Sequence, residues 1–244
     1  MNEAHILLGL ATLTGGFIRG YSGFGGPMTV LPVLNLIYPP AVSIWIMALV
    51  DLVANIYLVP TAKRYATANV YVPLVLGSLT SMMIGIYALV VFDAVTMRRV
   101  ICVAIIVSCC VLMSGWMFRS RLTAGSWLAV GAASGLVLGA TLIAVVTSVF
   151  INAASQDADR NRANFIIWGF VTGVALVVLL GYQVPSGMKF LPVAVALSVF
   201  YFAGCIAGAE VQRRVRLPFV RQITLVLIIL IAATSLAASY RTVG

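Results

Sequence analysis

The apolar run from Ile6 to Ile37 is interrupted by the stretch Arg19-Gly-Tyr-Ser-Gly-Phe-Gly-Gly-Pro27. Five glycines and a proline fall between Gly16 and Pro27. Each interior glycine costs a helix about 1 kcal/mol, and a proline about 3 kcal/mol, relative to alanine. Freed backbone groups are tolerated in lipid only where protein or a water-filled cavity satisfies them. The break is therefore a candidate binding site, and its arginine indicates that the ligand is an anion.

The composition is typical of a membrane protein. Hydrophobic residues make up 62% of the 244 residues and charged residues only 9%, against roughly 45–50% and 25% in soluble domains. The apolar segments run to about 20 residues, as transmembrane helices do, rather than to the alternating ten-residue segments of a barrel. We therefore predict an all-α integral membrane protein that crosses the bacterial inner membrane several times. The net charge of +9 is spread over short loops, which indicates a topology bias rather than nucleic-acid binding.

Charged and turn residues divide the chain into apolar segments and leave no stretch for a soluble domain, so we expect a single membrane domain over 1–244. The segments are 5–38, 41–59, 70–92, 98–118, 124–151, 163–181, 188–209 and 219–239. The four cysteines all lie inside these segments, without metal-ligand spacing. They are expected to be free structural thiols, and no metal site is predicted.

The two halves of the chain resemble each other weakly. The first break opens with Gly16-Phe-Ile-Arg-Gly20, and Gly131-Ala-Ala-Ser-Gly135 holds the same place in segment 124–151. Small-xxx-small spacing is mostly a helix-packing device, but interrupted helices at corresponding places in two halves point to a transporter's substrate site. We predict repeats over 1–121 and 122–244, each with a broken or re-entrant first helix followed by three transmembrane helices.

The positive charges discriminate between two topologies. If both broken segments simply span, six Lys or Arg fall on one side and eight on the other. If both are re-entrant hairpins, the division is ten against four, which obeys the positive-inside rule far better. The hairpin topology places the N-terminus outside and makes the repeats inverted. The ten residues expected on the cytoplasmic side are Lys63, Arg64, Arg119, Arg121, Arg160, Arg162, Arg213, Arg214, Arg216 and Arg221.

One stretch of the chain resembles the first signature of the TauE/SafE sulfite exporter family, also called TSUP transporters. It is Gly16-Phe-Ile-Arg-Gly-Tyr-Ser-Gly-Phe-Gly-Gly-Pro27, followed by Leu31-Pro32. The length, the two halves and the second Gly-xxx-Gly also resemble that family, so the resemblance covers essentially the whole chain. Family members usually keep another glycine-rich stretch, where this chain has Gly135-Leu-Val-Leu-Gly-Ala-Thr-Leu142. The resemblance implies transport of small anions such as sulfite, sulfoacetate, isethionate and other sulfonates, by uptake or export.

The first break supplies candidate ligands for an anion. If a half-helix begins near Pro27, its first N–H groups face the anion, because a helix N-terminus carries about half a positive charge. Arg19 offers a planar fork to two oxygens of a sulfonate or carboxylate; the alternative is an arginine that snorkels to the interface or caps the helix. Further backbone and hydroxyl donors are predicted at Tyr21, Ser22, Gly25, Gly26 and Met28.

Asp51 is the only acid embedded in a predicted spanning helix, and Asn55 follows it one turn later on the same face. Such a carboxylate is costly in lipid and usually faces a partner or a wet cavity. Three interpretations stay open. Asp51 is a proton-coupling site, a counter-ion that holds Arg19 when no substrate is bound, or half of a buried structural pair.

Polar residues of the second half are candidates for the opposite wall of the site. These are Thr141, Thr147 and Ser148, with Trp168 as a residue that stacks on the substrate. The alternatives are that the hydroxyls bond their own backbone and that the tryptophan packs in the core or anchors the interface.

Together these features predict a secondary transporter, an exporter or permease, of small anions. No Walker motif and no pair of nucleophile and base is present, so we expect neither an enzyme nor a cofactor. The expected partners are a small anionic substrate and the lipid bilayer, without nucleic acid, and small residues allow a homodimer. The alternatives are a passive anion channel and a structural membrane protein that transports nothing.

Overall fold

The computed structural model describes residues 3–23, 25–114, 123–154, 157–214, 225–226 and 228–236. These residues form helices and short connections, with no strand among them. In chain order the elements are α1 (Glu3–Ser22), α2 (Gly26–Ile37), α3 (Pro40–Ala62), α4 (Ala68–Val91), α5 (Ala94–Met113), α6 (Ala124–Thr141), α7 (Val145–Ala154), α8 (Ala158–Gln183), the 3₁₀ helix η1 (Pro185–Phe190) and α9 (Leu191–Arg214). Residues 228–236 are also helical. The predicted all-α fold is confirmed.

Among the described residues, six helical stretches are long and apolar enough to cross a membrane. They are Pro40–Ala62, Ala68–Val91, Ala94–Met113, Ala124–Thr141, Asp159–Gln183 and Gly187–Gln212. Large apolar side chains such as Ile84, Tyr87 and Val199 are more than half exposed on their outer faces, as a lipid-facing surface requires. The predicted multi-span helical architecture is confirmed.

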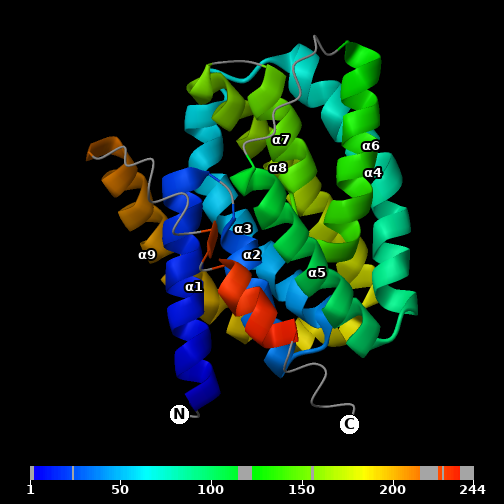
Figure 1. Ribbon diagram of the computed structural model, residues 1–244, viewed down its shortest axis with the longest axis vertical. Helices are drawn as coiled ribbons and strands as arrows, with labels where there is room; N and C mark the ends of the chain where they lie inside the picture. The colour runs from blue at the N-terminus through cyan, green and yellow to red at the C-terminus, as the bar shows by residue number, and fades with distance from the viewer. Residues whose placement is uncertain are drawn as a thin grey trace.

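The first broken segment folds back on itself as a helical hairpin (Figure 1). Gly23 and Gly25 connect α1 to α2 in the left-handed region, with φ of 81° and 88°, where other residues are strained. The start of α2 then returns along α1, because Gly15 lies against Gly26 and Val30. The interruption is narrower than the predicted 19–27, since α1 continues as a regular helix through Ser22.

The segment 124–151 is also broken, although its break contains no glycine. α6 ends at Thr141, and Leu142 caps it in the left-handed region with φ 59°. A leucine adopts this conformation only where the surrounding structure imposes it. Thr141 Oγ1 accepts a hydrogen bond from Ile143 N (3.3 Å) and so satisfies one N–H group that the break frees. The second half therefore has its own interrupted helix.

Glycines bring two pairs of helices into backbone contact. A Cβ at Gly16 of α1 would collide with the carbonyl of Tyr201 in α9, and a Cβ at Gly204 would collide with that of Leu13. The same close contact joins α4 to α6, and both pairs lie side by side (Figure 1). The glycines of the α4–α6 contact are Gly77, Gly85, Gly131, Gly135 and Gly139. The packing interpretation of the small-xxx-small spacing is confirmed in both halves.

Helices α3 and α8 run antiparallel through the centre of the bundle. At one end, Thr67 N, just after α3, donates to Asn164 Oδ1 near the start of α8 (2.7 Å). At the other end, Trp45 near the start of α3 packs against Gly187, which follows α8. The 63–67 loop and the start of α8 therefore lie at the same end of the bundle. The hairpin topology requires this placement.

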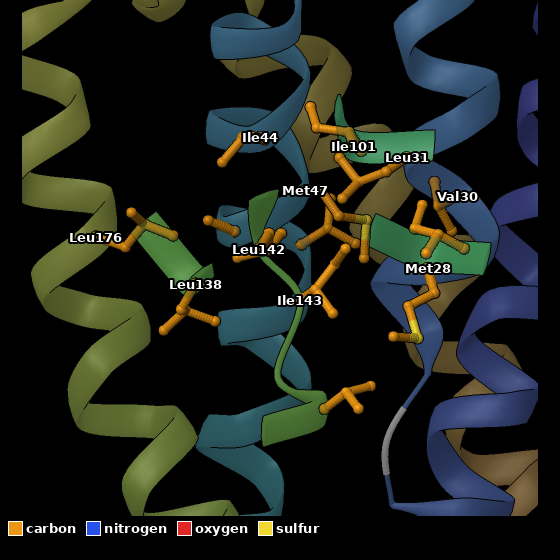
Figure 2. Packing of buried hydrophobic residues seen from close by; sticks show 14 of the residues in the cluster. Met28, Val30, Leu31, Ile44, Met47, Ile101, Leu138, Leu142, Ile143 and Leu176 are labelled. Carbon is orange, nitrogen blue, oxygen red and sulfur yellow. The ribbon is translucent and has the colours of Figure 1, made fainter. Parts of the chain in front are cut away.

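The buried core joins both breaks to the spanning helices. Figure 2 shows Met28 and Leu31 of α2 close to Met47 of α3 and to Ile143 at the second break. Lipid tails are as apolar as these side chains, so close packing and dispersion, rather than transfer from water, stabilise the arrangement. The core thus fixes the positions of the two breaks relative to α3.

Candidate anion-binding site

A cavity of about 50 Å³ lies between the two helix breaks. Its walls come from both breaks and from helices α1, α3, α6 and α8. The lining residues are Arg19, Gly25, Pro27, Met28, Ala48, Asp51, Leu52, Asn55, Leu138, Leu142, Ala144, Val145, Phe165, Trp168, Gly169, Thr172 and Gly173. Among these lining residues, one cation, Arg19, faces one anion, Asp51.

Arg19 lies in the last turn of α1 and is only 3% exposed. Its Nη1 donates to the carbonyl of Gly23, and its Nη2 donates to Asn55 Oδ1 (2.7 Å) and to Asp51 Oδ2 (3.4 Å). Nε lies 3.0 Å from Asp51 Oδ1 but is not aligned for a hydrogen bond, and it has no other partner among the described residues. The guanidinium is therefore neutralised by Asp51, while one of its donors stays unsatisfied.

Asp51 is held by residues from three helices. Tyr201 Oη of α9 donates to Oδ1 (2.7 Å), Asn55 Nδ2 of α3 donates to Oδ2 (3.1 Å), and Arg19 approaches from α1. The carboxylate side chain is 17% exposed and lines the cavity. The Arg19–Asp51 ion pair, which both the counter-ion and the structural interpretations require, is thus present. The Asp51 carboxylate also lines the cavity, as a proton-coupling site would require.

The α8 wall of the cavity is aromatic. Cζ of Arg19 lies 5.6 Å from the ring centre of Phe165, within the range of a cation–π contact. The rings of Phe165 and Trp168 are 5.6 Å apart, centre to centre. Trp168 Nε1 donates to Ser78 Oγ of α4 (2.8 Å), so the indole N–H has a partner within the protein. This contact supports the interpretation that Trp168 packs in the core. The cavity therefore has a charged side on α3 and an apolar side on α8.

Both half-helices begin at the cavity. α2 begins at Gly26, after Gly25 as a left-handed N-cap and with Pro27 in its first turn, where its missing donor is not needed. α7 begins at Val145, which lines the cavity together with Ala144. The first N–H groups of a helix lack intrahelical partners, and each N-terminus carries about half a positive charge. The starts of two helices and a guanidinium thus lie at the cavity beside one carboxylate, while α1 and α6 end at the same two breaks.

The structure brings half of the predicted site residues to this cavity. Those that line it are Arg19, Gly25, Met28, Asp51, Asn55 and Trp168. Gly26 does not line it, because it packs beneath the hydroxyl of Tyr201. Tyr21 lies outside the lining and stacks on Phe17, with 6.4 Å between ring centres. The side chain of Ser22 lies outside the described residues.

The three predicted hydroxyls of the second half are buried near the second break but do not line the cavity. Thr141 Oγ1 donates to Val137 O (2.6 Å), and Ser148 Oγ accepts from Asn152 Nδ2 (3.4 Å). Such contacts within one helix are typical of Ser and Thr in membrane segments. Thr147 Oγ1 has no partner among the described residues.

Two residues that contact the ion pair of the site were missed by sequence reasoning. Tyr201 is fully buried and bonds a carboxylate 150 positions earlier in the chain. Phe165 covers the guanidinium of Arg19 from α8. The one available signal was chemical, because a buried tyrosine hydroxyl usually finds a polar partner. Asp51 is that partner, but no local pattern joins the two.

The family model for the sulfite exporter TauE/SafE matches residues 7–235. This range includes both breaks, Arg19, Asp51 and Tyr201. Comparison with curated proteins and with solved structures gave no match. The family consists of membrane transporters rather than enzymes, in agreement with the six helices in the described part of the chain that are long and apolar enough to span a bilayer. The chain is therefore a multi-pass membrane protein and belongs to the TauE/SafE sulfite exporter family.

Proposed function

We propose that this protein is a secondary transporter that binds a small oxyanion in the cavity between its two helix breaks. The observation that carries the proposal is that Arg19 and the starts of α2 and α7 meet at one cavity. Interrupted helices whose N-termini point at a common space are the usual way in which transporters hold an anionic group. The buried location strengthens each of these donors, because little water competes for the anion.

The volume of the cavity favours a compact substrate. A cavity of about 50 Å³ is small and has room for a few water molecules. Sulfite, with one sulfur and three oxygens, suits this space. Sulfoacetate, isethionate and related organic acids would need the cavity to widen. We therefore place sulfite first among substrates and the organosulfonates second.

Binding would change the contacts of Arg19. In the structure, Asp51 occupies the edge of the guanidinium formed by Nε and Nη2. An incoming oxyanion competes with this carboxylate for the same planar fork. Release on the opposite face would follow when the two halves move around the fixed site. We propose that a proton gradient or the membrane potential drives transport.

We also propose that 1–121 and 122–244 are inverted repeats. Gly16 contacts Tyr201 and Gly20 contacts Cys205, so α1 runs parallel to α9 of the other half. In the same way α6 runs parallel to α4. The first helix of each half thus packs against a helix of the other half, and α3 crosses its counterpart α8 at the centre. This pairing supports two equivalent halves. Their inversion is supported by the position of the 63–67 loop at the same end of the bundle as the start of α8.

The test uses purified protein reconstituted in liposomes, with sulfite as the probe. Wild type is expected to bind sulfite and to show saturable uptake that sulfite on the opposite side stimulates. Arg19→Lys keeps the charge but loses the planar fork, so it should weaken binding partially. Arg19→Ala should weaken it about 10- to 150-fold, the equivalent of a charged hydrogen bond of about 1.5–3 kcal/mol.

The matched control is Arg214→Ala. Arg214 is 75% exposed and pairs with Glu210 (2.8 Å), so its loss should leave binding unchanged. Thermal unfolding of each variant checks that it is folded. Sulfite binding by Arg19→Ala at wild-type affinity would place the anion site elsewhere. Flux without saturation or stimulation from the opposite side would instead indicate a passive channel.

A further inference from the structure

The glycines that line the cavity on α8 differ from those at the helix contacts. At the α1–α9 and α4–α6 contacts, a Cβ would collide with neighbouring backbone. A Cβ at Gly169 would instead meet side-chain tips, Asn55 Nδ2 at 3.9 Å and Arg19 Nη2 at 4.0 Å. A Cβ at Gly173 would meet Leu52 Cδ1 at 3.8 Å.

Neither packing nor backbone conformation requires glycine at these two positions. The distances are ordinary van der Waals contacts, so alanine fits at Gly169 and Gly173 without moving a neighbour. Both residues lie inside a regular helix, where alanine is the better helix former. What the missing side chains provide is open space, on the strip of α8 that faces Arg19 and α3.

We propose that Gly169 and Gly173 set the size of the anion that the cavity accepts. The inference rests on the proposed function and adds the residues that select among its substrates. Gly169 faces the guanidinium, where the oxyanion group sits. Gly173 lies one turn further along α8, opposite Leu52, where the substituent of a larger anion would lie. A methyl group at either position takes up a substantial part of this small cavity of about 50 Å³.

The experiment compares wild type, Gly169→Ala and Gly173→Ala as full-length protein in detergent. Binding is measured for sulfite, methanesulfonate and sulfoacetate, which increase in size in that order. Gly169→Ala is expected to weaken the binding of sulfite about 5- to 150-fold, the usual cost of overpacking, and that of the sulfonates more. Gly173→Ala is expected to spare sulfite and to weaken sulfoacetate most.

Thermal unfolding separates this role from a structural one. Both variants are expected to unfold at the wild-type temperature or up to about 2–4 °C above it, because each gains helix propensity and loses no packing. The control is Gly9→Ala in α1, where a Cβ would meet nothing within 4 Å. This variant should gain the same stability and bind every anion as wild type does.

Each outcome decides the question. Unchanged affinities of Gly169→Ala for sulfite and sulfoacetate would overturn the proposal. A Gly169→Ala variant that unfolds at a lower temperature than wild type would also overturn it, because the glycine would then be needed for packing. Wild type that binds none of the three anions would contradict the proposed function itself. Wild-type binding that Gly169→Ala loses while it stays folded would support both.

Discussion

Asp51→Asn removes the charge that neutralises Arg19 while it keeps the shape of the side chain. The carboxylate lies 3.0 Å from Arg19 Nε and also accepts hydrogen bonds from Tyr201 and Asn55. Asparagine has a single acceptor oxygen, so its NH₂ group must face at least one of these donors. Removing one partner of a buried ion pair costs about 3–5 kcal/mol, and the partial exposure of Asp51 to the cavity favours the lower end, about 3 kcal/mol.

The assay is thermal unfolding in detergent, with and without sulfite. For a chain of this size, 1 kcal/mol corresponds to about 2–4 °C, so the midpoint should fall by about 6–12 °C. Sulfite should then restore more stability to the variant than it adds to wild type, because it supplies the missing negative charge without displacing a carboxylate. The gain follows RT ln(1 + [L]/Kd) and so reports a tighter affinity. The control is Asp93→Asn, since Asp93 is an exposed N-cap and asparagine caps equally well.

A variant that unfolds within about 2 °C of wild type and gains nothing extra from sulfite would refute this reasoning. An early-unfolding variant with a wild-type response to sulfite would mean that the pair is structural and does not compete with the anion. In liposomes, loss of proton-driven accumulation with intact sulfite exchange would identify Asp51 as the coupling site.

Three further predictions follow from the packing and the charges. Single cysteines at Ala66 and Ala158, in a cysteine-free background, should be labelled from the same, cytoplasmic face; labelling from opposite faces would contradict the inverted repeats. Tyr201→Phe removes the hydroxyl that bonds the Asp51 carboxylate, and calorimetry or thermal unfolding should show a loss of about 1.5–3 kcal/mol, the usual value for a hydrogen bond to a charged group. The pKa of Asp93 is lowered, mainly by the hydrogen bond from the Thr96 side chain and then by that from its backbone N–H. Its cap should therefore stabilise α5 above the ordinary carboxyl pKa and be lost as the pH falls through the lowered value, which unfolding of wild type and Asp93→Ala across the acidic range would measure.

Local chemistry was sufficient to predict the class of the protein and its first break. The excess of apolar residues and the near absence of charge indicate a membrane protein, and the apolar segments of about 20 residues select helices over a closed barrel, the other structure that satisfies every backbone group in lipid. Gly23 and Gly25 adopt positive φ, which glycine alone adopts at little cost. The candidates Arg19, Asp51 and Asn55 were found because polar groups are costly in lipid and must therefore have a use or a partner.

The tertiary structure alone decided what these groups contact. The second break lies at Leu142, where no glycine marks it, because the left-handed conformation is imposed by the packing around it rather than by residue preference. The Tyr201–Asp51 bond joins residues 150 positions apart, and no periodicity along the chain encodes such a distance. Whether a glycine joins two backbones, as Gly16 does, or leaves a cavity open, as Gly169 does, depends on the helix that lies opposite. Sequence periodicity identifies the face of a helix, but the partner of that face is set only when the whole bundle packs.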